Sequence, residues 1–599
     1  MRLKSNKIEA FTLPTVVIVS IVMLSLMVSA FQFLSASSIA LRDQYYNQLA
    51  REAAEAGARR IEECWKSGSD ILTTATITPR TNCSGTSLST QVDYVMSSGP
   101  LVTTYSGKVV NREADGHRRA LVTGITNLNG ASGSTPIKSY TAETVLEKTL
   151  DNDPVGARAS QRYWYFGVGA GLDFRNSGTA WPLPINSPPS GSWAFEGSTV
   201  VSDRSGNLVF WTNGQQVWGK NGALAQNASG LLGSSSATQA VAAFPLNQEQ
   251  TRYGIISNTT GSSDSEYTGT PFTPSQKWRL YFSEYDTTLN NGNGGITANR
   301  KNIDLWSAGT SYGYASEALN AMPNHDGTGY WVYTFPKDTP ATPRGDLIYG
   351  FLIGPDGNVR QRITYTLPTD PLLCSGGSVY GTINFNDDYS QMLVMIGTSG
   401  CQTTYPSTDA RRQVSGTVYL LNTNRATGYP VQQKVWNSKV NHAVTDSSPR
   451  NAGYSADFSP NGQYVYVTQL YPGWLTRYTL SAADVSTTQH TLSHTSSGTP
   501  TVPAAGNAAT WNGGGQIRRG PDGRMYISRN PYTGTYPVPD SAERSRISCI
   551  TNPNATGYPT LATLGFQNPC TGVTLNAGTY SWFGLPQMVT VYTPKIIYY

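Results

Sequence analysis

Hydrophobic and polar positions divide the chain into regions of different periodicity. An uncharged apolar run extends from Phe11 to Leu34, and it is long enough to cross a bilayer as a helix. Beyond it, without an intervening glycine or proline, apolar positions recur at helical spacing: Leu41, Tyr45, Leu49, Ala53, Ala58, Ile61 and Trp65. The pattern predicts one helix over residues 11–66, about 80 Å long and amphipathic in its second half.

Segments rich in β-branched residues follow the helix. Residues 101–110, 118–128 and 138–150 have this composition, and Gly, Asn and Asp turns separate them. We expect these segments to form a small sheet that packs on the end of the helix, in a domain spanning residues 67–155.

Short aromatic strands separated by glycine-containing turns fill the chain from about residue 163. One phrase, a polar turn followed by an alternating apolar strand, recurs at 200–214, 324–335, 384–397, 457–470 and 518–530. Recurrence at intervals of roughly 60 to 70 residues is typical of a β-propeller whose blades carry long loops.

The predicted fold class is therefore mainly β. A long N-terminal helix with a small sheet precedes a β-propeller of about seven blades over residues 156–599. The C-terminal segment YSWFGLPQMVTVY is expected to complete the blade begun by YWYFGVGAGLDF at 163–174, which would remove exposed strand edges.

Composition adds little charge to this picture. Only 14% of the residues are charged, the formal net charge is +5, and no Lys/Arg cluster is interleaved with aromatic residues. A nucleic-acid groove needs such a cluster, so we expect no nucleic-acid partner.

The cysteines fall into three couples that are local in the sequence: Cys64 with Cys83, Cys374 with Cys401, and Cys549 with Cys570. None forms a metal-binding knuckle, and disulfides outside the cytoplasm are the predicted state. Free buried thiols are the alternative.

Residues 1–10 form a short basic leader, because Arg2, Lys4 and Lys7 outnumber Glu9. By the positive-inside rule the N-terminus stays inside and the rest of the chain is exported. The expected location is the cytoplasmic membrane, crossed once, and then the cell surface. A plain signal anchor, or a signal peptide cut near Ala30, is the alternative.

The basic leader, a small residue, Phe-Thr-Leu and a long apolar helix together resemble the class III signal of type IV prepilins and pseudopilins. The resemblance implies cleavage between Ala10 and Phe11 by a prepilin peptidase, and assembly with other pilin subunits through the helix. Thr15 stands where the family usually has a glutamate that aids repeated filament assembly. Loss of that glutamate is familiar in minor pilins and tip pseudopilins.

The order of aromatic phrases over residues 160–599 is similar to the YVTN/WD40-like propeller region of large secreted surface proteins of Bacteroidetes. This resemblance implies an interaction module without naming its ligand.

Chemical motifs are sparse. The five histidines are scattered, and no HExxH, G-x-S-x-G or P-loop sequence occurs, so we expect no catalytic residues, metal or cofactor. The acidic turns at Asp203, 387–388 and Asp522 invite a calcium hypothesis, but turn formation explains them more simply. Exposed aromatic residues on two Pro/Gly loops are candidate ligand contacts: Tyr471, Trp474, Tyr532 and Tyr536.

These features predict a minor, tip-located pilin or pilin-like surface protein that is not an enzyme. Its propeller would bind a protein or glycan on a host or neighbouring cell. The alternatives are a tethered or secreted propeller enzyme of the lactonase or lyase type, and a surface scaffold that never enters a pilus.

Overall fold

The structure is a computed structural model. It describes residues 13–66, 75–91, 96–98, 100–112, 118–129, 136–150, 161–175, 181–189, 192–203, 206–247, 249–259, 272–306, 314–325, 327, 329–336, 347–368, 381–397, 414–439, 453–469, 475–492, 514–529, 545–557, 559–560, 562–567, 569–589 and 594–598. The chain divides into two compact units. The first comprises Met1–Arg112, Arg118–Lys148 and Ile596–Tyr599, and the second comprises Glu113–His117 and Thr149–Lys595.

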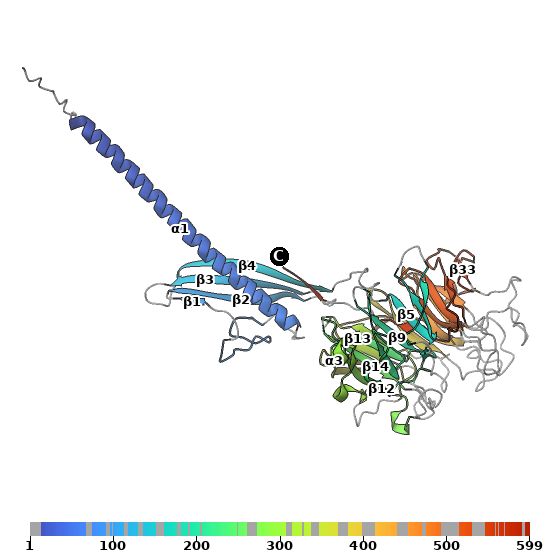
Figure 1. Cartoon of the computed structure of the whole chain (residues 1–599). Coiled ribbons are helices and arrows are strands. Elements are labelled where there is room, and N and C mark those ends of the chain that lie inside the picture. Colours follow the sequence, from blue (N-terminus) through green and yellow to red (C-terminus); the bar gives the residue numbers. More distant parts are fainter. Residues whose placement is uncertain are drawn as a thin grey trace, which may run out of the picture. The chain divides into compact units, whose positions relative to one another are not determined.

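Helix α1 runs from Leu13 to Lys66 without interruption (Figure 1), which confirms the predicted long helix over the described residues. In its first half the large apolar side chains between Val16 and Leu34 are each at least 48% exposed. A window of this helix has a mean hydropathy of 2.4, and none of that window is buried. By length and composition, this half of α1 is suited to act as a membrane anchor or signal.

The second half of α1 is buried against a sheet. Among the predicted stripe, Leu49, Ala53, Ala58, Ile61 and Trp65 are all less than 9% exposed. The prediction was wrong for the first two positions, because Leu41 is 67% exposed and Tyr45 51% exposed. Extensive burial of the helix therefore begins at Leu49, about two turns later than its apolar spacing suggested.

The first unit contains a five-stranded sheet in the order β1-β2-β3-β4-β35. Its strands are β1 (Met96–Ser98), β2 (Leu101–Arg112), β3 (Arg118–Asn129), β4 (Pro136–Leu150) and β35 (Pro594–Tyr598). The three predicted strands are confirmed to within two residues at each end. The last strand was not anticipated: the expected propeller ran to residue 599, whereas β35 joins this sheet beside β4.

Small residues let α1 approach β3 closely. A Cβ atom added at Gly124 would lie 1.9 Å from the Ala50 carbonyl oxygen and 2.5 Å from the Ala54 amide nitrogen, far inside van der Waals contact. Ala50 and Ala54 are themselves fully buried. Gly124 is thus the point at which the helix backbone rests on the sheet, and no side chain fits between them.

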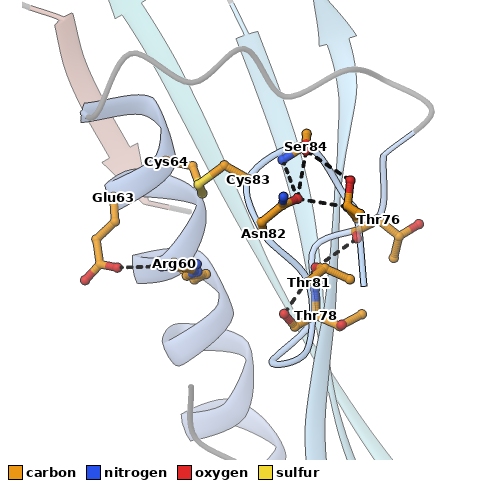
Figure 2. The surroundings of a disulfide bond; sticks show 10 residues. Arg60, Glu63, Cys64, Thr76, Thr78, Thr81, Asn82, Cys83 and Ser84 are labelled. Atoms are coloured by element: carbon orange, nitrogen blue, oxygen red, sulfur yellow. Dashed lines mark hydrogen bonds and ion pairs between the residues drawn. A yellow bond between two sulfur atoms is a disulfide. The ribbon is translucent and has the colours of Figure 1, made fainter. Parts of the chain in front are cut away.

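Further contacts fix the helix at both ends of its buried half. Near the start, the Asp43 carboxylate accepts hydrogen bonds from Lys138 Nζ at 2.7 Å and from the Tyr140 hydroxyl, both on β4. Near the end, Cys64 and Cys83 form a disulfide with Cα atoms 5.5 Å apart, as predicted. Figure 2 shows Cys83 in a loop. In this loop the side-chain oxygen of the preceding residue, Asn82, accepts hydrogen bonds from the backbone N–H and the hydroxyl of Ser84.

Six β-sheets build the second unit within the described residues, and because the ten-stranded sheet holds two blades they make seven blades, in agreement with the prediction of about seven. The first blade consists of β5 (Tyr163–Val168), β6 (Ala170–Asp173), β7 (Leu183–Asn186) and β8 (Trp193–Ala194). The second consists of β9 (Ser198–Ser202), β10 (Leu208–Thr212), β11 (Gln216–Gly219) and β12 (Leu224–Ser229). The third consists of β13 (Val241–Pro245), β14 (Arg252–Asn258), β15 (Leu280–Asp286), β16 (Gly295–Ile296) and β17 (Ile303–Asp304). A parallel pair, Gln226 with Gly295, links the second and third blades into one ten-stranded sheet.

The remaining four blades are regular four-stranded antiparallel sheets. They consist of β18 (Asn320–Pro323), β19 (Tyr330–Thr334), β20 (Leu347–Ile353) and β21 (Val359–Thr366); β22 (Gly381–Phe385), β23 (Gln391–Gly397), β24 (Val414–Asn422) and β25 (Val431–Lys439); β26 (Gly453–Phe458), β27 (Tyr464–Gln469), β28 (Leu475–Thr479) and β29 (His490–Leu492); and β30 (Gly514–Arg519), β31 (Met525–Arg529), β32 (Ser548–Ile550) and β33 (Phe566–Gln567). Short helical segments lie at α3 (Leu289–Gly292), η1 (Pro274–Gln276), η2 (Ala298–Arg300) and η4 (Val485–Thr488).

The recurring phrase forms the turn between the first and second strands of a blade. Equivalent backbone hydrogen bonds close these turns, including Asn386 N to Gln391 O at 3.2 Å and Ser459 N to Tyr464 O at 2.8 Å. Gly462, which follows Asn461, and Gly523, which follows Asp522, have φ angles of 67° and 79°, so these two turns use the left-handed region.

The C-terminal segment pairs with the first two blades, but the prediction that it completes the blade begun at 163–174 was wrong, because β5 to β8 form that blade and the C-terminal strand joins β9 of the next one. Tyr580 and Val168 exchange backbone hydrogen bonds of 2.8 and 2.9 Å, and β34 (Pro586–Gln587) pairs in parallel with β9. Aromatic packing crosses the same junction, because Trp164 on β5 and Tyr526 on β31 contact edge to face at 5.6 Å. The first and last blades are therefore joined both by backbone pairing and by core packing.

Replacing Gly124 with valine should loosen the first unit. Valine favours strands more than glycine does, so any loss of stability must come from the collision of the valine side chain with α1. In hydrogen exchange on the detergent-solubilised full chain, peptides from β3 and residues 49–65 should exchange at least about tenfold faster, consistent with an overpacking cost of about 1–3 kcal/mol. The control is Thr123→Ala, because Thr123 is the neighbour of Gly124 in the sequence and is only partly buried. Unchanged protection in Gly124→Val would contradict the proposed close contact.

Candidate functional site

The first strand of each blade lies against the first strand of its neighbours, and polar side chains link these strands across the centre of the propeller. We call this set the axial network. Its members are Glu196, Thr199, Thr238, Gln239, Glu317, Asn320, Asn384, Tyr454, Asp457, Gln516, Arg518 and Gln587. All of them except Glu196, which is partly buried, are less than 9% exposed.

Two carboxylates and a tyrosine form one part of the axial network. The Tyr454 hydroxyl on β26 donates to Glu196 Oε2 at 2.8 Å, although the two residues are 258 positions apart. Glu317 Oε2 accepts from the Thr238 hydroxyl at 3.0 Å and from its backbone N–H at 3.3 Å. Burial raises the pKa of Tyr454 well above its ordinary value, and the Glu196 charge and hydrogen bond raise it further. Tyr454 therefore acts as a neutral hydrogen-bond donor.

Three glutamines connect distant blades in the middle of the network. Gln239 Oε1 accepts from the backbone N–H groups of Leu319 at 3.1 Å and Ile383 at 2.9 Å. Gln587 donates to the Leu319 carbonyl at 2.9 Å, and Gln516 donates to the Thr238 carbonyl. These amides satisfy backbone groups that the centre of the propeller would otherwise leave unpaired.

A charged cluster occupies the ends of β22, β26 and β30. Asn384 Nδ2 donates to the Ala456 carbonyl at 2.6 Å, and its Oδ1 accepts from Arg518 Nη1. The Asp457 carboxylate accepts from the Arg519 backbone N–H at 3.1 Å and lies 3.3 Å from Arg519 Nε. Burial acts to lower the pKa of Arg519, but the charges of Asp457 and Asp387 outweigh it and raise that pKa.

The axial network thus combines hydrogen-bond acceptors such as the Glu196 carboxylate, neutral donors such as the Tyr454 hydroxyl, and the buried guanidinium group of Arg518. Carboxylates such as Glu196 can take up a proton from a bound nucleophile, and buried guanidinium groups can hold anions. Among the described residues, no group of three or more His, Cys, Asp or Glu side chains is placed to hold a metal ion.

The binding and cleavage residues predicted from sequence lie outside the described residues. They are Ala10, Phe11, Tyr471, Trp474, Tyr532 and Tyr536, together with the predicted couple Cys374 and Cys401. The couple Cys549–Cys570 is confirmed as a disulfide with Cα atoms 5.2 Å apart.

The acidic turns have local partners in the structure. Asp203 accepts from the Asn207 backbone N–H at 2.8 Å and from the Asn207 side chain at 3.0 Å. Asp522 accepts from Arg524 Nη1 at 2.7 Å and from the Tyr526 hydroxyl at 2.7 Å. Turn formation therefore accounts for these two carboxylates.

Sequence reasoning missed the axial network, although the recurring phrase carried a signal for part of it. Asn384, Asp457 and Arg518 each stand two residues before the residue whose N–H closes the turn, which is Asn386, Ser459 and Gly520 respectively. Aligning the phrases on that residue would have shown a polar side chain at equivalent positions of three blades. Since side chains alternate between the faces of a strand, the common position predicts a common environment.

Comparison with known proteins gives similarity of fold only. No family model and no curated protein matches the chain. Similar solved structures include a candidate 6-phosphogluconolactonase from Bacteroides fragilis, with 10% identity and a TM-score of 0.37, covering 73% of this chain and 98% of that one. Another is the periplasmic gluconolactonase PpgL of Pseudomonas aeruginosa, with 11% identity and a TM-score of 0.30, covering 60% of this chain and 78% of that one. A third is the β-propeller domain of Myceliophteria thermophila Cps50, with 8% identity and a TM-score of 0.34, covering 62% of this chain and 93% of that one.

These comparisons correct the prediction that the chain is not an enzyme. Two of the three proteins carry lactonase names, so membership of this fold gives no ground for excluding catalysis. The sequence had suggested the exclusion because familiar motifs are absent, but residues that converge on an axis from separate blades leave no local motif. The chain combines an apolar N-terminal helix, a small sheet and a β-propeller of seven blades in its described residues.

Proposed function

We propose that the chain is a minor subunit of the type IV pilin class that carries its propeller to the cell surface. Residues 1–10 are removed as a leader, and the apolar half of α1 holds the subunit in the cytoplasmic membrane until it enters a pilus or pseudopilus. The partners in this proposal are the prepilin peptidase and other pilin subunits.

The division of α1 into two halves is the observation that supports this proposal. Side chains from Val16 to Leu34 are exposed, whereas one face of the helix between Leu49 and Trp65 is buried on the sheet and a disulfide fixes Cys64. A helix exposing so long an apolar surface needs a membrane or other helices to cover it. Its sheet-packed half supplies a rigid connection to the exported domain.

The propeller is the binding part of the subunit in this proposal. It contacts a protein or glycan on a host or neighbouring cell, and nucleic acid is not among its partners. A head of this size would crowd a filament if every subunit carried it. We therefore place the subunit at the pilus tip or at sparse positions.

The mature N-terminus tests the pilin assignment. Mass spectrometry of the protein from cells with the prepilin peptidase should find Phe11 as the first residue, and cells lacking the peptidase should retain Met1. Ala10→Asp should block the cut, because a small residue precedes it, whereas the matched variant Ala30→Asp should be processed normally. An intact Met1 in wild-type cells, or a cut near Ala30, would reject the pilin pathway.

A second candidate function is hydrolysis by the propeller, of the lactone class. The partly buried Glu196, paired with the neutral Tyr454 hydroxyl at 2.8 Å, favours this candidate. In it, the Glu196 carboxylate takes the proton of an attacking water, and Tyr454 donates a hydrogen bond that holds the carboxylate in place. The nearby Glu317 adds negative charge, which helps to keep Tyr454 protonated.

A panel of lactones tests the second candidate. Purified wild-type chain should open at least one lactone, and Glu196→Gln should lower kcat/KM about 100-fold or more while the amide oxygen still accepts from Tyr454. The exposed Glu249→Gln is the control and should retain full activity. If the wild type turns over no lactone, or if both variants lose activity equally, this candidate fails and the pilin proposal is unaffected.

A further inference from the structure

Arg518 has donors that no group of the described residues satisfies. The residue is 7% exposed on β30, and Nη1 donates to Asn384 Oδ1. The Nε and Nη2 atoms are buried and have no hydrogen-bond partner in the part of the chain that the structure describes. An unpaired donor on a buried charged group is costly, because the group has lost the water that would solvate it.

The carboxylates near Arg518 contact its neighbour instead. Asp457 accepts from the backbone of Arg519 and pairs with its Nε at 3.3 Å, and Asp387 pairs with Arg519 Nη1 at 2.6 Å. Arg519 also donates to the Phe385 carbonyl. Arg519 is therefore paired twice, whereas Arg518 forms no ion pair with a carboxylate of the described residues.

The charge of Arg518 persists at neutral pH despite its burial. Burial lowers the pKa of Arg518 to about 10, and the charge of Asp457 opposes that decrease. A guanidinium group offers parallel N–H donors that match two oxygens of a carboxylate or phosphate. The chemistry of the unpaired atoms thus specifies an oxyanion rather than a neutral ligand.

The charged cluster extends to the protein surface. The Asp387 side chain is 80% exposed, and it contacts Arg519, whose side chain is 17% exposed. Arg518 is the next residue and lies among the ends of β22, β26 and β30. An anion approaching this end of the propeller would meet Asp387 and Arg519 first, and it reaches Arg518 only when the side chains that cover Nε and Nη2 move aside.

We propose that Arg518 binds one small oxyanion, through a carboxylate or phosphate group, at the end of the axial network beside Asn384. Nε and Nη2 donate to the anion, while Nη1 remains on Asn384. This site lies within the propeller and does not depend on whether the chain enters a pilus.

Thermal unfolding of the full chain in detergent tests the site, with inorganic phosphate and citrate as the two probes at matched ionic strength. At least one probe should raise Tm saturably in the wild type. Arg518→Met should weaken the apparent affinity at least about tenfold. Without a probe, this variant should be at least as stable as the wild type, because an apolar side chain replaces an unpaired buried charge. The exposed Arg360→Met is the control and should respond like the wild type.

The two probes separate the possible sources of the ligand. A response to phosphate alone indicates a phosphorylated ligand, and a response to citrate alone indicates a carboxylate. An equal rise in Tm for wild type and Arg518→Met would overturn the proposal, because excluded anions stabilise proteins without a site. If Arg518→Met does not fold, hydrogen exchange of the β30 peptide in the wild type decides. Saturable protection by a probe supports the site, and unchanged exchange rejects it.

Discussion

The close contact between α1 and β3 is the constraint on which the first unit depends. Because Gly124 has no side chain, the backbone near Ala50 and Ala54 rests directly on the strand, and the buried helix surface can be built largely from alanines. Asp43 and the Cys64–Cys83 disulfide hold the two ends of this contact. The apolar half before it then has no partner within the described chain, and this half gives the chain its proposed route to the membrane and the pilus.

The propeller solves a different problem, which is how to close a ring without leaving polar groups unpaired. Backbone pairing between Tyr580 and Val168 joins its ends, and side chains such as Gln239 and Gln516 satisfy backbone groups of other blades. Gln239 and Gln516 each make several such hydrogen bonds, which stabilises the centre, whereas Gln587 Oε1 has no partner among the described residues. The same convergence brings Tyr454 onto Glu196 and Arg518 onto Asn384.

Periodicity predicted the elements well, because the signals that define them are local. The helix, the three long strands of the small sheet and the turns at Gly462 and Gly523 follow from residues close together in the sequence. The exposure of Leu41 and Tyr45, the return of β35 and the axial network depend on where distant segments meet. Tyr454 and Glu196 are 258 positions apart, so no local pattern joins them. The prediction that the protein is not an enzyme was wrong for the same reason, because it relied on the absence of local motifs.

Electron microscopy of intact cells, with antibody against the propeller, tests the central claim that the exposed half of α1 carries the propeller into a filament. The account predicts label at filament ends or sparse points along them. This label should disappear in Leu24→Lys, which places a charge on the exposed apolar half without touching the sheet-packed half. Label spread over the cell body, or filament label that persists in Leu24→Lys, would contradict the account.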